Sequence, residues 1–149
     1  MSSLPLSSLP LSSLPLNFYF TTQDPEFSTN TIIVPTSDNS YISHVFVKAP
    51  LYNLANVQIG YKVTDDYVQQ VAPNKYVVRL NNTYYIEGSG SISWQYVFEN
   101  DKPSVFYPVN QLAASNIIST TGEYYGKTGK VSLFPKPDGT RIVNVTFDS

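Results

Sequence analysis

Three adjacent residues of this chain match part of a motif for binding phosphate. The segment Gly126-Lys127-Thr128 has the types that end a phosphate-binding loop, in which backbone amides and a lysine hold the phosphate groups. Such a loop also needs a glycine five residues before Gly126, but that position is Thr121, and a strand pattern rather than a helix follows. The sequence therefore argues against a phosphate-binding loop here.

The titratable side chains offer few candidates for catalysis or metal binding. The chain has one histidine and no cysteine, and His44 has no carboxylate at a recognisable spacing, so we expect a packed or surface residue. Asp65 and Asp66 could donate oxygens to calcium, but the spaced acidic ligands of a dedicated loop are missing, which favours a solvated turn. Solvent-facing, strand-end or turn positions explain the other charges near the central strands: Arg79, Glu87, Glu99 and Glu123. We predict no catalytic residue, no metal site and no cofactor.

Two aromatic residues are the possible ligand contacts. Trp94 and Tyr96 lie two residues apart, so they share one face of a strand and could stack on a sugar or another ring. Ile92 and Phe98 share that face, which favours core packing over ligand binding.

The N-terminus is a repeat. The pentapeptide SSLPL occupies residues 2–6, 7–11 and 12–16, and its prolines exclude a helix. It carries no charge and six leucines, which are Leu4, Leu6, Leu9, Leu11, Leu14 and Leu16. One interpretation is a disordered low-complexity tail. The other is an arm that docks on a neighbouring subunit or partner, because exposed leucines promote aggregation unless they are covered.

Composition and patterning predict an all-β chain. Of 149 residues, 14% are aromatic and 13% charged, and the net charge of -2 disfavours nucleic acid and membrane partners. Polar and apolar residues alternate in short segments, expected as strands at 32–34, 41–48, 56–64, 67–71, 76–80, 83–87, 91–99, 130–134 and 141–147. Pro50, Asp65-Asp66 and Asn81-Asn82 are expected to interrupt these strands, and residues 100–110 to form an irregular functional loop. Residues 111–119 are expected to contain a further strand, and they are the one place where the pattern allows a helical turn, before that strand.

These segments predict one closed antiparallel β-barrel of about eight strands, residues 17–149, preceded by an extended arm, residues 1–16. No signal peptide or transmembrane segment is recognised, and the localisation is unknown.

A glycine-rich segment adds a family resemblance. An apolar pair, Ile117-Ile118, precedes Thr121-Gly122, an aromatic residue at 124, and Gly126 and Gly129, and we expect Gly122, Gly126 and Gly129 to form a barrel corner. This arrangement resembles the late strand–turn–strand signature of the allene oxide cyclase and dirigent barrels, over residues 41–148. Where that family usually has two glycines, this chain has Ser119 and Thr120.

The resemblance implies an eight-stranded barrel, often dimeric or trimeric, whose apolar cavity uses carboxylates or an arginine on a bound lipid or phenolic intermediate. No catalytic residue of that family can be matched by motif. We therefore favour a non-enzymatic structural or assembly protein, a homo-oligomer or subunit of a capsid, filament or other shell. The alternatives are a barrel that binds or cyclises a small hydrophobic molecule, and a carbohydrate- or surface-binding module that uses Trp94.

Overall fold

The computed structural model describes residues 14–35 and 41–148, which form nine β-strands and a short 3₁₀ helix, η3 (Gly122–Tyr124). The strands are β1 (Leu16–Thr21), β2 (Ser28–Pro35), β3 (Tyr41–Asn53), β4 (Gln58–Ala72), β5 (Lys75–Ile86), β6 (Gly90–Asn100), β7 (Ala113–Thr120), β8 (Gly129–Pro135) and β9 (Thr140–Phe147). No helix among the described residues is long and apolar enough to cross a membrane.

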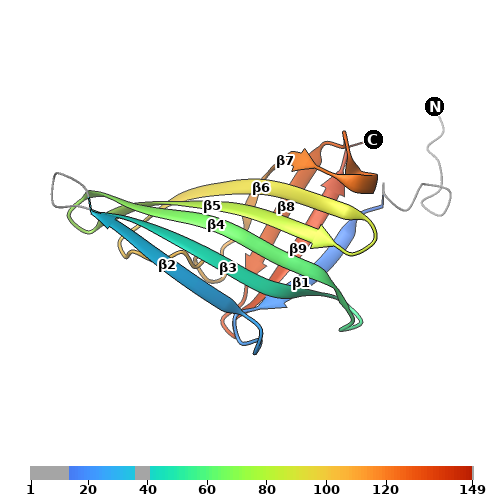
Figure 1. Ribbon diagram of the computed structural model, residues 1–149, viewed down its shortest axis with the longest axis horizontal. Coiled ribbons are helices and arrows are strands. Elements are labelled where there is room, and N and C mark those ends of the chain that lie inside the picture. Colours follow the sequence, from blue (N-terminus) through green and yellow to red (C-terminus); the bar gives the residue numbers. More distant parts are fainter. Residues whose placement is uncertain (1–13, 36–40, 149) are drawn as a thin grey trace.

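The sheet closes on itself. All neighbouring strands are antiparallel, in the order β1-β9-β8-β7-β6-β5-β4-β3-β2, and β1 also pairs with the end of β3 through Phe18↔Asn53 and Tyr19↔Tyr52. This contact closes the barrel, which consists of β1 and the seven strands from β3 through β9. Strand β2 is an additional strand that pairs with the first half of β3 (Figure 1). The predicted all-β closed barrel is confirmed.

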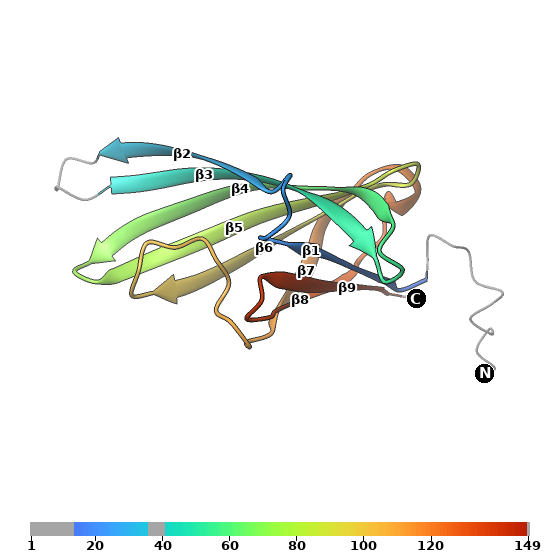
Figure 2. The same cartoon turned by 90° about the horizontal axis from the view of Figure 1, so that it is seen from below.

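One wall of the barrel is much longer than the other. Strands β3 to β6 have 11 to 15 residues, whereas β7, β8 and β9 have 7 or 8. The long strands therefore project beyond the short ones, and the segment 101–112 between β6 and β7 crosses the open side below them (Figure 2). The expected irregular loop is confirmed here, at the mouth of the barrel.

Several expected strand breaks are wrong. Pro50 lies within β3, at a point between the residues that pair with β2 and those that pair with β1, so its missing amide donor leaves no ladder incomplete on that side. Asp65-Asp66 lie inside β4 and Asn81-Asn82 inside β5, and the two segments lie opposite each other in the β4–β5 ladder. Continuous pairing on both sides overrides the local turn preference of these residues.

The turn between β7 and β8 lies where the glycines predicted it. Gly122, Gly126 and Gly129 have φ values of 66°, 79° and 155°, which favour glycine over residues with a side chain. The allowance for a helical turn within 111–119 is wrong, because those residues lead directly into β7 and the 3₁₀ turn follows that strand instead.

Strand β4 buries its polar face. Gly60, Lys62, Thr64 and Asp66 point inward, while Val63, between them, is 50% exposed on the outside. From the hydrophobic pattern alone, the face that carries Val63 would be expected to point into the core and the polar face outward. Phe18, Phe20, Trp94, Leu133 and Val143 belong to the core that fills the rest of the barrel.

Replacement of Gly60 by alanine should weaken the β4–β5 pairing. An added Cβ would lie 1.8 Å from the carbonyl oxygen of Tyr85, so the two strands must separate. We expect Gly60→Ala to lower the free energy of unfolding by about 3 kcal/mol, measured with denaturant. Gly126→Ala is the control, since nothing lies within 4 Å of its added Cβ and only backbone strain of about 1 kcal/mol applies. Equal losses in both variants would contradict this account of Gly60.

Candidate functional site

A cluster of polar and charged side chains occupies the interior of the barrel. Lys62, Thr64 and Asp66 alternate along the inner face of β4, because side chains two residues apart in a strand share a face. Lys62 is 5% exposed and Asp66 3%. On β5, Tyr84 lies opposite Lys62 and Asn82 opposite Thr64, so both strands contribute polar groups at the same level.

The opposite wall and the loop complete this cluster. Arg141 on β9 is buried and lies opposite Phe20 on β1. Its Nη1 donates hydrogen bonds to the carbonyl oxygens of Lys136, at 3.3 Å, and Thr140, at 3.4 Å. Tyr107, from the loop 101–112, is also buried and donates its hydroxyl proton to Asn82 Oδ1 at 3.2 Å. We call Lys62, Asp66, Asn82, Tyr107 and Arg141 the interior cluster.

The two charged groups of β4 are incompletely paired. Asp66 Oδ2 accepts a hydrogen bond from Thr64 Oγ1 at 3.0 Å, but Asp66 Oδ1 is buried without a partner in the described part of the chain. Lys62 Nζ lies 3.9 Å from the centroid of the Phe20 ring and makes no ion pair with the residues described. Such groups cost free energy in a folded protein, so their presence calls for a functional explanation.

Burial moves the titration of both groups toward neutral pH. Desolvation raises the pKa of the Asp66 carboxyl to about 6, although the Lys62 charge and the Thr64 hydroxyl oppose this change. Desolvation also lowers the pKa of the Lys62 ammonium to about 8, against the attraction of Asp66 and with the help of the Arg141 charge. Perturbed groups of this kind concentrate at functional sites, and these two titrate as a coupled pair.

A small cavity adjoins the interior cluster. Its volume is about 20 Å³, enough for one water molecule, and Lys62, Asp66, Asn82, Tyr107 and Arg141 all line it. Further out lies an open pocket of about 420 Å³, to which Tyr107 and Arg141 also contribute. Its other lining residues are Thr22, Gln23, Phe27, Phe106, Val109, Lys136, Pro137 and Gly139. Tyr107 and Arg141, together with Thr22, Phe27 and Phe106, therefore line both the inner cavity and the open pocket.

The predicted aromatic contacts lie within the barrel. Trp94 is completely buried, and its ring stacks with that of Tyr107 at a centroid distance of 6.4 Å. Tyr96 is partly buried, and its ring centroid lies 6.0 Å from that of Tyr107. A surface platform built on Trp94 is therefore wrong, because its indole cannot reach an external sugar.

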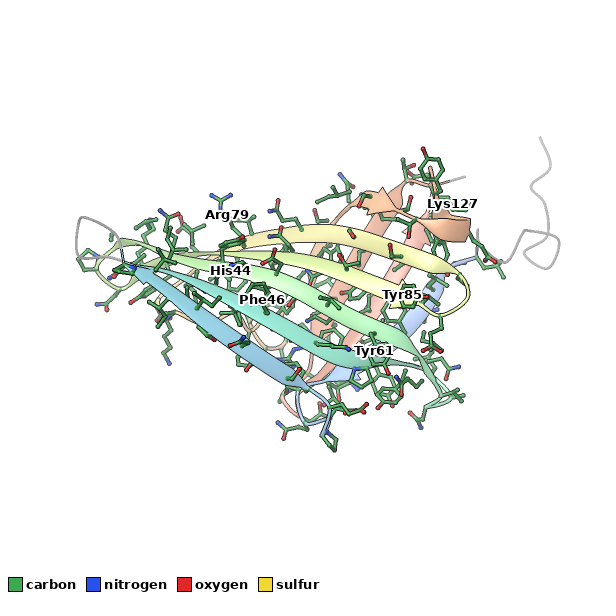
Figure 3. The ribbon with its side chains drawn as sticks, in the orientation of Figure 1. His44, Phe46, Tyr61, Arg79, Tyr85 and Lys127 are labelled. Atoms are coloured by element: carbon green, nitrogen blue, oxygen red, sulfur yellow. The ribbon has the colours of Figure 1, made fainter. Side chains whose placement is uncertain are left out.

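The interpretation of Asp65-Asp66 as a solvated turn is wrong, because both residues lie within β4. Asp65 faces outward, where its Oδ1 contacts His44 Nε2, so His44 does have a positioned carboxylate, supplied by the neighbouring strand. The His44 ring also stacks on Tyr67, with centroids 4.2 Å apart. Figure 3 shows His44 and Phe46 on the outer face of the long strands.

Other candidates stay outside the cluster. Arg79, Glu87, Glu99 and Glu123 are exposed, as expected. No group of three or more metal-binding side chains occurs in residues 14–35 and 41–148. Leu4, Leu6, Leu9 and Leu11 lie outside the described residues, and Leu16 is the first residue of β1, where it pairs with Val145. Docking of the arm stays a prediction.

Sequence patterns singled out only Asp66 among the interior cluster, and only as a possible calcium ligand in a turn. The sequence nevertheless indicates that these residues share a face. Gly60 and Val68 are small or apolar and lie an even number of residues apart, so in one strand they face the same way as Lys62, Thr64 and Asp66 between them. Tyr107 had a weaker signal, as part of the expected functional loop. The inward direction of Arg141 depends on pairing between distant strands.

Comparisons with known proteins show the fold but no family. No protein family model matches the chain, and no curated protein does. Among solved structures, the chain is similar to "Pyocyanin demethylase", with a TM-score of 0.59 and 14% sequence identity, over 91% of this chain and 100% of that one. The resemblance to allene oxide cyclase and dirigent proteins is thus supported only in its coarser part, an antiparallel β-barrel.

Removal of both charges of the interior cluster on β4 should stabilise the protein. In Lys62→Met/Asp66→Asn the desolvation cost of two buried charges disappears while the side-chain volumes are nearly kept. We expect the free energy of unfolding at pH 7 to rise by about 1–3 kcal/mol, measured by denaturant titration. The matched control is Lys75→Met/Glu99→Gln, an exposed pair with an N–O distance of 3.6 Å, which should change stability by less than about 1 kcal/mol.

The stability of the single variant Lys62→Met should depend on pH, because it leaves the Asp66 carboxylate buried without the Lys62 charge. The pKa of Asp66 in the folded protein exceeds its ordinary value, so between about pH 4 and pH 6 Asp66 is protonated more in the folded than in the unfolded state. The free-energy cost of burying the Asp66 charge therefore falls, and stability rises, as the pH is lowered through this range. Lys62→Met should therefore be destabilised at pH 7 and partly recover at pH 5. A double variant less stable than the wild type would mean that the pair is structural.

Proposed function

We propose that this protein binds a small molecule at the mouth of its barrel and transfers protons to or from it through Asp66 and Lys62. The observation that carries the proposal is the buried Asp66 carboxylate beside the inner cavity, whose Oδ1 has no hydrogen-bond partner among the described residues. General acid–base catalysis works best when the pKa lies near the operating pH, and the pKa of Asp66 is raised to about 6. Asn82 and Tyr107 are the neutral groups placed to orient a ligand.

The open pocket suits a ligand with an apolar body and an anionic group. Phe27, Phe106 and Val109 provide apolar surface, while Lys136 and Arg141 provide positive charge. The nearby Asp138 carboxylate is exposed and already accepts a hydrogen bond from the Thr140 amide at 2.9 Å. The similar solved structure is named as a demethylase of pyocyanin, which supports the use of this fold for chemistry on a small molecule.

Binding of 8-anilinonaphthalene-1-sulfonate, an aromatic anion, tests the pocket. Trp94 is the only tryptophan and stacks with Tyr107, so its fluorescence reports on the mouth of the barrel. We expect saturable binding with quenching of Trp94, weakened about tenfold or more in Arg141→Gln through loss of a charge-assisted contact. Lys130→Gln, an exposed change on β8, is the control and should bind normally. Equal affinities in the two variants, or no saturable binding, would refute a ligand site at Arg141.

A second proposal concerns assembly, and the observation that favours it is the free edge of β2. Among the strands of residues 14–35 and 41–148, this strand pairs only with β3, and it contains no charged residue. Its residues Ile32, Ile33 and Val34 are 50–63% exposed. Uncharged, apolar edge strands pair readily with other chains.

We propose that the uncharged SSLPL arm of a second copy binds along β2, where an added edge strand tolerates proline. Arms exchanged in this way would tether subunits in a capsid, filament or other shell.

Deletion of residues 2–13 tests the assembly proposal without removing any described residue. We expect native mass spectrometry to show oligomers for the full chain and monomers for the deletion variant. Ile33→Lys should give the same shift, since it places a charge on the β2 edge. Gln95→Lys on the outer face of β6 is the control and should leave the oligomer intact. Identical mass distributions for the full and shortened chains would exclude the arm as a tether.

A further inference from the structure

The environment of Lys62 suits covalent chemistry as well as proton transfer. We propose that Lys62 Nζ is a nucleophile that forms a Schiff base with the carbonyl group of a small 2-oxo acid bound at the mouth of the barrel. This inference rests on the proposed ligand site and names its substrate class.

The amine of Lys62 is free to react. It makes no ion pair or hydrogen bond with the described residues, its Nζ lies over the Phe20 ring, and it lines the inner cavity. Only an unprotonated amine can attack a carbonyl, and lysines become nucleophilic when they are desolvated or lie near another cation. Both conditions hold here, because Lys62 is buried and the Arg141 charge adds to the lowering of its pKa.

The amount of free amine follows from this pKa. With a pKa of about 8, roughly a tenth of Lys62 is unprotonated at pH 7. For an exposed lysine with an ordinary pKa the fraction is below about one in a thousand. A carbonyl compound should therefore distinguish Lys62 from the surface lysines by rate.

Asp66 is placed to assist the second half of the reaction. The lone pair of Nζ forms the C–N bond, the carbonyl oxygen takes up a proton, and the nitrogen loses one, which gives a carbinolamine. The Asp66 carboxyl then donates a proton to the departing hydroxyl, which leaves as water while the C=N bond forms, and the resulting iminium returns a proton to the Asp66 carboxylate to give the imine. One amine and one carbonyl yield one imine and one water, so the step needs no oxidant or reductant. Both side chains line the same cavity, so a carbonyl carbon that reaches Lys62 there also lies beside Asp66.

Arg141 selects the acid next to the carbonyl. Its Nη1 is engaged by two backbone carbonyl oxygens, which leaves the other N–H groups of the guanidinium for a ligand carboxylate. In a 2-oxo acid the carboxylate and the carbonyl are on adjacent carbons, so a carboxylate held by Arg141 at the open pocket would bring the carbonyl next to the inner cavity, which Arg141 and Lys62 both line. This cavity of about 20 Å³ has room for one water molecule while Tyr107 is in place, so the carbonyl reaches Lys62 only when the Tyr107 ring moves, and the smallest acid does so most easily. Glyoxylate, the smallest 2-oxo acid, is therefore the probe.

Reductive trapping tests the inference. The full chain is incubated at pH 7 with glyoxylate and sodium cyanoborohydride, which reduces an imine to a stable secondary amine, and the labelled lysines are identified by peptide mass spectrometry. We expect Lys62 to be carboxymethylated at least tenfold faster than the exposed Lys130 of the same molecule. Asp66→Asn should slow labelling of Lys62 without affecting Lys130, and Lys62→Arg should abolish the fast phase.

Three results would overturn the inference in separable ways. Labelling of Lys62 no faster than that of Lys130 refutes the nucleophile, and this comparison needs no variant. If Arg141→Gln labels Lys62 as fast as the wild type does, the 2-oxo acid class is wrong. If neither glyoxylate nor the aromatic anion binds, the proposed ligand site itself fails, whereas Arg141-dependent binding of the anion without labelling leaves that site intact.

Discussion

Lys62, Thr64 and Asp66 are inside the barrel because Gly60 and Val68, in the same two-residue series of β4, are packed there. The Cα of Gly60 is so close to the backbone of Tyr85 that no side chain fits, and Val68 is part of the core. A shift of β4 by one residue would bring Val63 inside and expose Asp66, but it would also place Tyr61 against the β5 backbone. The close approach at Gly60 therefore holds the charged residues in the interior.

The surroundings of these residues explain why their charges matter. Phe20, Leu80 and Tyr107 line the same cavity and exclude water, so desolvation is the largest contribution to the pKa changes of Lys62 and Asp66. Tyr107 belongs to the loop rather than to the barrel wall, and a single hydroxyl hydrogen bond to Asn82 connects it to β5. Val105 and Phe106 of the same segment also line the cavity, so access to the pair and its low-dielectric environment depend on the segment 101–112. The short strands β7 to β9 leave the side opening that this segment crosses.

The sequence was sufficient for the class of fold and for much of the barrel, but not for the interior cluster. Alternation predicted β6 and β9 well, and the glycine-rich corner expected at Gly122, Gly126 and Gly129 corresponds to a turn between β7 and β8 in which all three glycines have positive φ. Asp65-Asp66 and Asn81-Asn82 do not interrupt their strands because pairing with strands on both sides, which only the closed sheet supplies, outweighs local turn preference, whereas Pro50 is tolerated because β3 has no partner at that point on one side. The turn preference also hid Asp66, since a residue assigned to a turn is not considered as a buried acid. Arg141 could not be found locally, because its inward direction follows from its pairing with Phe20, more than a hundred residues away along the chain.

The interior and the arm are joined through β1. This strand begins with Leu16, the last leucine of the repeats, and pairs with β9 over six consecutive residues, from Leu16↔Val145 to Thr21↔Thr140. A slip of one residue would turn Phe18 and Phe20 out of the core, so the register is strongly fixed. The β1–β9 ladder would thus hold β1 in place against a force on the arm, so the Phe20 ring, over which Lys62 Nζ lies, would move little. The two proposed functions can therefore coexist in one chain, because the strand that connects them is held by the core and transmits little displacement from one to the other.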